Sequence, residues 1–231
     1  MKQENGIKSL APEERPYEKC ERYGVSSLSN IELLAILLRN GTKGESSLNL
    51  AKRILYNASS GDGLLSLHDW SSEQLLALNG IGRVKTIQIM SLLELAKRLA
   101  MARAESGLNF KEPASIARYY MEDLRHNKQE VMKLLLLNSK NTLIDSTNIA
   151  KGTVNSSVIT PRELFIIALQ KHAVSIILMH NHPSGDPMPS KEDVLLTRRI
   201  YEAGAMLGVE LLDHIVIGNN CYVSLREKGF L

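Results

Sequence analysis

The side chains with the clearest capacity for chemistry lie in one segment, HNHPSGDPMPSKED at residues 180–193, which directly follows the apolar run AVSIILM. Residues i and i+2 of an extended chain point to the same side, so His180 and His182 can present two imidazoles to one point. Zinc binds neutral imidazole and accepts a carboxylate as a third ligand, with a fourth position open to water in catalytic sites. Asp193 falls in the first turn of an expected helix, where the loop can fold it back toward the histidines. The spacing therefore predicts a metal site made by His180, His182 and Asp193.

Each part of this segment also has an ordinary structural interpretation. Ser190-x-x-Asp193 is a capping-box sequence, in which the two side chains satisfy backbone N–H groups at the start of a helix. Histidines at the end of a strand are commonly surface residues, and HPSGDP is good turn sequence. The metal interpretation is favoured because these features coincide at the carboxyl end of a buried strand, where ligand sites tend to lie.

Other catalytic motifs are absent from the sequence. It contains no HExxH zinc-protease helix, no PCxxC after the histidines, and neither GxxxxGK[ST] nor GxSxG. The segment Gly80-Ile81-Gly82 lacks the third glycine of a dinucleotide-binding fingerprint.

The second half of the chain alternates strands and helices. The apolar run Val131–Leu137 is typical of a buried strand, and NSKN at residues 138–141 is typical of a turn. Thr160 followed by Pro161 predicts a helix start, with the threonine as N-cap and the proline in the first helical position. The expected elements are strands at 131–137 and from 142, a helix from 161 to about 171, a strand at 173–179, a helix from 190 to about 207, and strands at 209–217 and 221–225.

The first half shows helical periodicity up to about Arg103. Ser29 with Glu32 and Ser71 with Gln74 are two capping-box pairs, and Gly41 is a natural helix stop. The polar segment RAESGLNFKEP that follows predicts a linker. We therefore expect an α+β chain with two domains, an all-helical domain at residues 1–104 and a domain with a mixed sheet at residues 105–231.

The composition is that of a globular protein with a true core, at 231 residues, 44% hydrophobic and 23% charged. No apolar run approaches the roughly 20 residues that span a bilayer, and the first residues contain no apolar signal region. Cys20 and Cys221 form neither a CxxC motif nor a metal knuckle, which predicts a reduced, cytoplasmic location. The net charge of +3 is too small to indicate nucleic acid by itself, although residues 1–104 hold 14 Lys and Arg against 11 Asp and Glu.

The pattern His180-x-His182-x7-Ser190-x2-Asp193 matches the JAMM signature of JAB/MPN-type metalloproteases. The chain also resembles the bacterial RadC family over nearly its whole length, through PYEKCERYGVSSLSNIELLAILLRNGTKG, LNGIGRVK and LLDHIVIG. This resemblance implies a helical domain followed by a JAB/MPN-like, cytidine-deaminase-like domain that binds Zn²⁺ through His180, His182 and Asp193. It also implies that Ser190 holds a water at the metal or stabilises the oxyanion.

The same resemblance implies a general acid/base glutamate on the first strand, and the matching position is Glu130 in KQEVMKLLLLNS. From the sequence, Asp145 and Glu163 remain alternatives. His214, in LLDHIVIG, is either a group behind the metal ligands or a strand histidine with a structural partner. In such a site the metal lowers the pKa of bound water toward about 7, and a carboxylate within hydrogen-bond reach moves the proton to the leaving amine.

The segment Leu78–Lys85, LNGIGRVK, resembles the helix-hairpin-helix element of DNA-repair proteins. Gly80 and Gly82 would allow a tight turn whose backbone N–H groups face a phosphate, and Arg83 and Lys85 would add positive charge. Such contacts recognise the DNA backbone and not its sequence. The alternative is that the hairpin packs two helices or docks a protein. In either case we expect its apolar residues to lie in the core, namely Leu75, Leu78, Ile81, Val84 and Ile87.

Three functions are compatible with these features. The first is a zinc-dependent hydrolase acting on a peptide or isopeptide bond, with a helical module that localises it to DNA or to a partner protein. The second is a metal-dependent nuclease acting on DNA held by the hairpin, because an activated water can attack phosphorus as well as carbonyl carbon. The third is a non-catalytic, DNA-associated scaffold, since the family's name associates it with DNA repair.

Overall fold

The computed structural model describes residues 11–56, 63–105, 108–152 and 159–231. Contacts within the chain divide it into two compact units, Met1–Ala96 and Lys97–Leu231. The division falls inside the long helix α5, Arg83–Glu105. The boundary that the sequence suggests, between residues 104 and 105, stays a prediction. None of the helices in the described ranges combines the length and the apolar character needed to cross a membrane.

The first unit is helical in its described residues. Its elements are η2 (Pro12–Glu14), α1 (Pro16–Tyr23), η3 (Val25–Ser27), α2 (Asn30–Leu38), α3 (Ser47–Tyr56), η4 (Leu65–Asp69), α4 (Ser72–Ala77) and the first part of α5. Both predicted capping boxes are present, with Ser29 and Glu32 at the start of α2 and Ser71 and Gln74 at the start of α4. Helix α2 ends at Leu38 and not at Gly41, because Arg39 adopts a positive φ of 62°.

The core of the first unit is formed by apolar residues of α2, α3, η4, α4 and α5 and of the turn between α4 and α5. Its buried members are Leu34, Ala35, Leu38, Leu50, Ala51, Ile54, Leu55, Leu67, Leu75, Ile81 and Ile89. The prediction that Val84 and Ile87 belong to this core is wrong, since they are 70% and 53% exposed. The first turns of α5 contribute only one narrow stripe of residues to the core, and these two side chains lie outside it.

The second unit contains one sheet of five strands with the order β2-β1-β3-β4-β5. The strands are β1 (Val131–Leu137), β2 (Leu143–Lys151), β3 (Ser175–Asn181), β4 (Glu210–Ile217) and β5 (Tyr222–Ser224). All neighbouring pairs are antiparallel except β3 and β4, which are parallel and are joined through helix α8, Lys191–Leu207. The chain is therefore α+β, a helical region followed by a mixed sheet with helices, as the sequence predicts.

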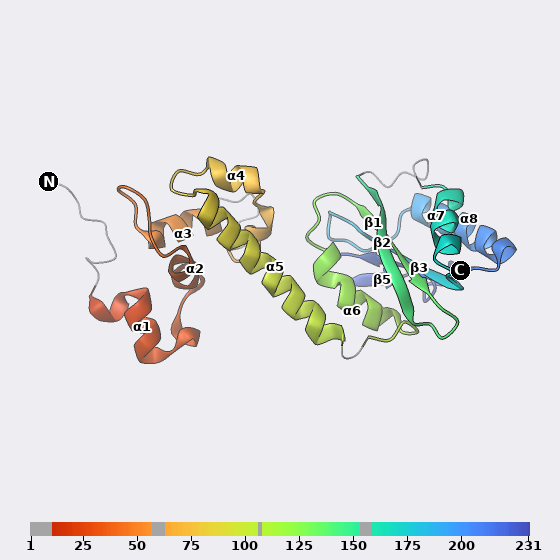
Figure 1. Cartoon of the computed structure of the whole chain (residues 1–231), viewed down its shortest axis with the longest axis horizontal. Helices are drawn as coiled ribbons and strands as arrows, with labels where there is room; N and C mark the ends of the chain where they lie inside the picture. The colour runs from red at the N-terminus through yellow and green to blue at the C-terminus, as the bar shows by residue number, and fades with distance from the viewer. Residues whose placement is uncertain (1–10, 57–62, 106–107, 153–158) are drawn as a thin grey trace. The chain divides into compact units, whose positions relative to one another are not determined.

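Helices cover both faces of this sheet (Figure 1). On one face, residues such as Leu134 and Leu178 pack against α8 and α7 (Pro161–Gln170). On the other face, residues such as Leu135 and Ile177 pack against α6 (Pro113–Leu124). Alternation along β3 therefore sends successive side chains into two different cores.

Most predicted boundaries in the second unit agree with the structure, and two differences matter for the site. Strand β3 begins and ends two residues later than predicted, so His180 and Asn181 are strand residues that pair with β1 and β4. Helix α6 is absent from the elements expected from the sequence, because the polar segment that ends at Pro113 indicates a linker. Pro113 is in fact the first residue of α6, and the helix buries one stripe of residues, Ile116, Ala117, Tyr120 and Leu124.

The hairpin between α4 and α5 gives a test of backbone conformation. Gly80 has a φ of 86°, and a Cβ at this position would lie 2.8 Å from the Thr42 side chain. Gly82 has open space where a Cβ would lie. We expect Gly80→Ala to lower the free energy of unfolding of the first unit by about 1–3 kcal/mol, the typical cost of a left-handed non-glycine residue. Gly82→Ala, the matched control, should change it by less than about 0.5 kcal/mol.

Urea unfolding followed by tryptophan fluorescence measures this difference. Trp70 is the only tryptophan of the chain, and its indole donates to Ile54 O at 3.0 Å within the first unit. Equal unfolding midpoints for the two variants would show that Gly80 is not held in this conformation.

Candidate metal centre

Three potential metal ligands converge where β3 ends and α8 begins. His180 is the sixth residue of β3, and His182 continues the strand direction by donating its backbone N–H to Ile217 O at 2.9 Å. The two Nε2 atoms lie 3.0 Å apart. The Asp193 carboxylate approaches both rings, with Oδ1 at 3.4 Å from His180 Nε2 and Oδ2 at 3.5 Å from His182 Nε2. One donor atom from each of the three residues lies within 4.8 Å of the others.

The capping box at the start of α8 places the Asp193 carboxylate. Ser190 donates to Asp193 Oδ2 from its backbone N at 2.8 Å and from its hydroxyl at 2.7 Å, and Asp193 N donates to Ser190 Oγ at 3.1 Å. The structural interpretation of Ser190-x-x-Asp193 is therefore correct, and it does not exclude the metal interpretation. Because the cap holds one end of the carboxylate, the other oxygen faces His180.

The donor set suits a cation. His182 Nδ1 lies 2.8 Å from Asp186 O, a carbonyl that can only accept, so this nitrogen carries the hydrogen of the neutral ring. His182 Nε2 then presents a lone pair toward His180 Nε2 and the Asp193 carboxylate. Lone pairs and a carboxylate at such distances repel one another unless a proton or a metal ion lies among them. Two imidazoles and one carboxylate fit zinc in number and type.

The electrostatics of the site point in the same direction. Burial by itself would raise the pKa of Asp193, but the contacts with His180, His182 and Ser190 outweigh it and place this pKa far below its ordinary value. The Asp193 carboxylate raises the pKa of His182 against the opposing effect of burial, and Glu130 raises it further. Negative charge thus accumulates around the imidazoles and favours a positive charge between them.

The three candidate ligands differ in access to solvent. The His180 side chain is 0% exposed and the Asp193 side chain is 8% exposed. The His182 side chain is 14% exposed. His182 is therefore the candidate ligand most open to solvent.

Of the three carboxylates considered for the general base, Glu130 is the one whose charge acts on a candidate metal ligand. It directly precedes β1, whose Met132 pairs with His180, and its charge acts on His182. Asp145 pairs in register with Leu136 near the opposite end of β1 and forms an ion pair with Lys171 at 2.9 Å. Glu163 takes part in the cap of α7.

Asn181 anchors the segment that carries Glu130. Its side chain points to the face opposite His180, where Oδ1 accepts from Val131 N at 2.8 Å and Nδ2 donates to Asn127 O at 3.1 Å and Gln129 O at 3.2 Å. The residue between the two histidines therefore fixes the backbone on both sides of Glu130. Sequence reasoning missed this residue, because its partners lie about 50 positions away and leave no local pattern.

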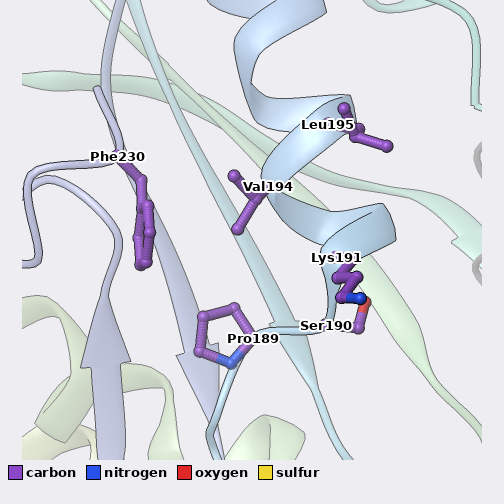
Figure 2. Close-up of a pocket in the computed structure, with 6 residues that line it drawn as sticks. All are labelled: Pro189, Ser190, Lys191, Val194, Leu195 and Phe230. Atoms are coloured by element: carbon purple, nitrogen blue, oxygen red, sulfur yellow. The ribbon is translucent and has the colours of Figure 1, made fainter.

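An apolar depression of about 450 Å³ lies beside Ser190, on the side of α8 that faces the C-terminal residues. Its lining residues are Pro189, Ser190, Lys191, Val194, Leu195 and Phe230. Figure 2 shows Pro189, Val194 and Phe230 grouped on one side of the first turn of α8, with Lys191 and Ser190 on the other. The depression offers an apolar surface directly next to a residue of the candidate metal centre.

The hairpin residues predicted to contact DNA lie in the first unit. Arg83 is exposed, whereas the Lys85 ammonium donates to Gly41 O at 3.1 Å and Gly80 O at 2.9 Å. Lys85 therefore stabilises the turn, and Gly80 packs on Thr42. The contact of Gly80, Gly82, Arg83 and Lys85 with DNA stays a prediction.

We expect the purified protein to bind one Zn²⁺ per chain. Asp193→Ala should abolish stoichiometric binding, because it removes one of three ligands, whereas Glu130→Gln should retain it, because Glu130 is not a ligand. Isothermal titration of zinc into protein stripped with a chelator measures both. Asp186→Ala is the control for a nearby carboxylate outside the ligand set, and equal zinc binding by Asp193→Ala and the unchanged protein would contradict the assignment.

The second unit and the first unit each match a known sequence family. The profile of the RadC-like JAB domain matches residues 110–230, and that of the UPF0758 N-terminal region matches residues 7–87. A UPF0758 protein of Clostridium tetani is 47% identical over 225 residues, which cover 97% of each chain. A UPF0758 protein of Clostridium botulinum is 45% identical over 223 residues, or 96% of each chain. A UPF0758 protein of Alkaliphilus metalliredigens is 44% identical over 226 residues, which cover 98% of this chain and 97% of the relative.

These relatives extend over nearly the whole chain, although their names do not state an activity. The RadC-like JAB domain contains all three residues of the metal centre, together with Glu130 and Asn181. This chain is therefore a member of the RadC family, with a UPF0758 N-terminal region followed by a RadC-like JAB domain.

Proposed function

We propose that this protein is a zinc-dependent hydrolase that cleaves peptide or isopeptide bonds with its JAB domain. The observation that carries the proposal is the convergence of His180, His182 and Asp193, whose donor atoms lie within 4.8 Å of one another. A ligand set of two imidazoles and one carboxylate leaves a fourth position for water, as in catalytic zinc sites. JAB-type domains are commonly hydrolytic, which supports the same assignment.

The chain's own residues supply the remaining steps of such a hydrolysis. Zn²⁺, when bound, supplies a Lewis acid that acidifies water and polarises a carbonyl oxygen. Glu130 is the general base that takes a proton from the attacking water, and it returns this proton to the leaving amine as the general acid. Ser190 holds Asp193 in place, and its hydroxyl must rotate away from Oδ2 before it can donate to an oxyanion.

Two features favour a peptide over a nucleic acid as the substrate of this site. The depression beside Ser190 is lined mainly by apolar side chains, which suit an apolar side chain of a peptide better than a phosphate. The Glu130 carboxylate, whose charge acts on His182 and which is not a metal ligand, adds negative charge beside the ligands and disfavours a polyanion more than a neutral peptide. Both features make the nuclease the less favoured hypothesis.

For the helical unit we propose a role in localisation, by weak contact with DNA or with a partner protein. The exposed Arg83 and the backbone N–H groups at the start of α5 would contact phosphate, while Lys85 maintains the turn. Binding of this kind is independent of base sequence and falls steeply with salt.

The zinc-loaded protein should hydrolyse members of a mixed peptide and isopeptide-linked substrate library, with products identified by mass spectrometry. Glu130→Gln should lower the rate by about 100- to 10,000-fold, the usual contribution of a general acid/base, without loss of zinc. Glu163→Gln is the matched control and should leave the rate unchanged. The peptidase assignment would be contradicted if the same preparation cut single-stranded or branched DNA and released no peptide product. Loss of this DNA cleavage in Asp193→Ala would then favour the nuclease.

Asn181→Ala should separate positioning of Glu130 from metal binding. The substitution removes three contacts with residues 127–131, so we expect turnover to fall on the order of 100-fold while zinc affinity stays within a few-fold. In the Glu130→Gln background the same substitution should cause little further loss, because both changes act through one group. Independent, multiplicative losses in the double variant would show that Asn181 does not act through Glu130.

A further inference from the structure

A chain of hydrogen bonds runs behind the metal centre, from the backbone of α8 through β4 to β3. Thr197 Oγ1 lies 2.6 Å from Asp193 O and 2.6 Å from His214 Nδ1. His214 Nε2 lies 2.8 Å from His180 Nδ1. Thr197, His214 and His180 are each 0% exposed, so water does not compete for these contacts. The order of donors and acceptors in this chain can be derived from both of its ends.

The end at α8 determines which nitrogen of His214 carries a hydrogen. Asp193 O is a carbonyl and can only accept, so the single hydroxyl hydrogen of Thr197 is donated to it. The Thr197 oxygen must then accept from its other close neighbour, His214 Nδ1. His214 therefore carries its hydrogen on Nδ1 and has a lone pair on Nε2.

The end at the metal centre leads to the same arrangement. His180 Nε2 faces His182 Nε2 and the Asp193 carboxylate, so it can be a ligand only when it carries no hydrogen. The hydrogen of a neutral His180 ring is then on Nδ1 and is donated to His214 Nε2. The reverse arrangement would place a hydrogen on His180 Nε2, inside the ligand set, and would take the hydroxyl of Thr197 away from Asp193 O.

We propose that Thr197 and His214 are positioning residues that hold His180 in the one tautomer and orientation that can bind the metal. The proposal rests on the metal centre of the proposed hydrolase and adds residues from outside the ligand motif. The first acceptor in this series of hydrogen bonds is the backbone carbonyl of Asp193, whose side chain is itself a candidate ligand. These hydrogen bonds, which we call the Thr197–His214 relay, therefore connect the candidate ligand Asp193 on α8 to the candidate ligand His180 on β3. The third candidate ligand, His182, is oriented separately by Asp186 O.

Thr197→Val and Thr197→Ser form a matched pair for the test. Valine keeps the branched shape of the buried side chain but removes the acceptor, whereas serine keeps the hydroxyl. We expect Thr197→Val to weaken zinc binding by about 10- to 100-fold, the usual effect of losing a group that orients a metal ligand, and Thr197→Ser to stay within a few-fold of the unchanged protein. Competition with a chromophoric chelator at constant neutral pH measures the affinities, and circular dichroism of the metal-free proteins confirms folding.

Nuclear magnetic resonance of the histidine ring nitrogens gives a second readout that a purely structural role would not change. The chain has 6 histidines, so single His→Gln variants can assign the spectrum. In the unchanged protein we expect the hydrogen of His214 on Nδ1, with and without zinc, and the hydrogen of zinc-loaded His180 on Nδ1. In Thr197→Val we expect His214 to populate the other tautomer.

Two results would overturn the proposal. One is a hydrogen on Nε2 of His214 in the unchanged protein, which requires no variant and no bound metal to observe. The other is equal zinc affinity for Thr197→Val and Thr197→Ser with unaltered tautomers. If the zinc affinities and the histidine tautomers are as expected but no peptide is hydrolysed, the roles of Thr197 and His214 are supported and only the proposed hydrolase activity is refuted.

Discussion

The alternation of side chains at the end of β3 is the constraint on which the candidate site depends. Three successive residues point to opposite faces of the chain in turn, so His180 faces α8 and Asn181 faces the segment after α6. His182 again lies on the side of His180, and their Nε2 atoms come within 3.0 Å. A shift of one residue in the register of β3 would exchange the ligands for the asparagine and would remove both the metal centre and the anchor of Glu130.

Burial makes this arrangement costly without a cation. His180 is fully buried and Asp193 is nearly so, so the Asp193 carboxylate has little contact with water. A carboxylate in such a place is normally tolerated only when it is paired or coordinates a metal. The capping box, the carbonyl of Asp186 and the chain through Thr197 each fix one ligand from behind. Together they leave the Nε2 atoms and Asp193 Oδ1 directed toward a common centre.

The parts of the fold and the site that could be predicted from sequence are those with local causes. Thr160 with Pro161, Ser29 with Glu32, and Ser190 with Asp193 are cap patterns within four residues, and the structure contains each of them. The proximity of His180 and His182 follows from strand geometry alone. Their relation to Asp193 follows from the short loop and from resemblance to a metal-binding family.

The parts that could not be predicted depend on contacts between residues far apart in the chain. Thr197 looks like an ordinary helix residue, and only the packing of α8 on β4 brings it to His214, which the sequence left undecided between two roles. The function of Asn181 likewise requires the α6–β1 segment to lie beside the end of β3. Helix α6 is missed because the polar segment that ends at Pro113 indicates a linker. The exposure of Val84 is missed because apolar spacing indicates a buried stripe but does not say which side chains a neighbour covers.

The proposed function depends on the binding of one zinc ion by these three side chains, with a position left for water. A crystal structure of zinc-loaded protein, with anomalous data collected on both sides of the zinc absorption edge, tests it most directly. We expect one anomalous peak at about 2.0–2.2 Å from His180 Nε2, His182 Nε2 and an Asp193 oxygen, with a water as the further ligand. Zinc bound elsewhere, or rings of His180 and His182 turned away from a common point in fully loaded crystals, would contradict it.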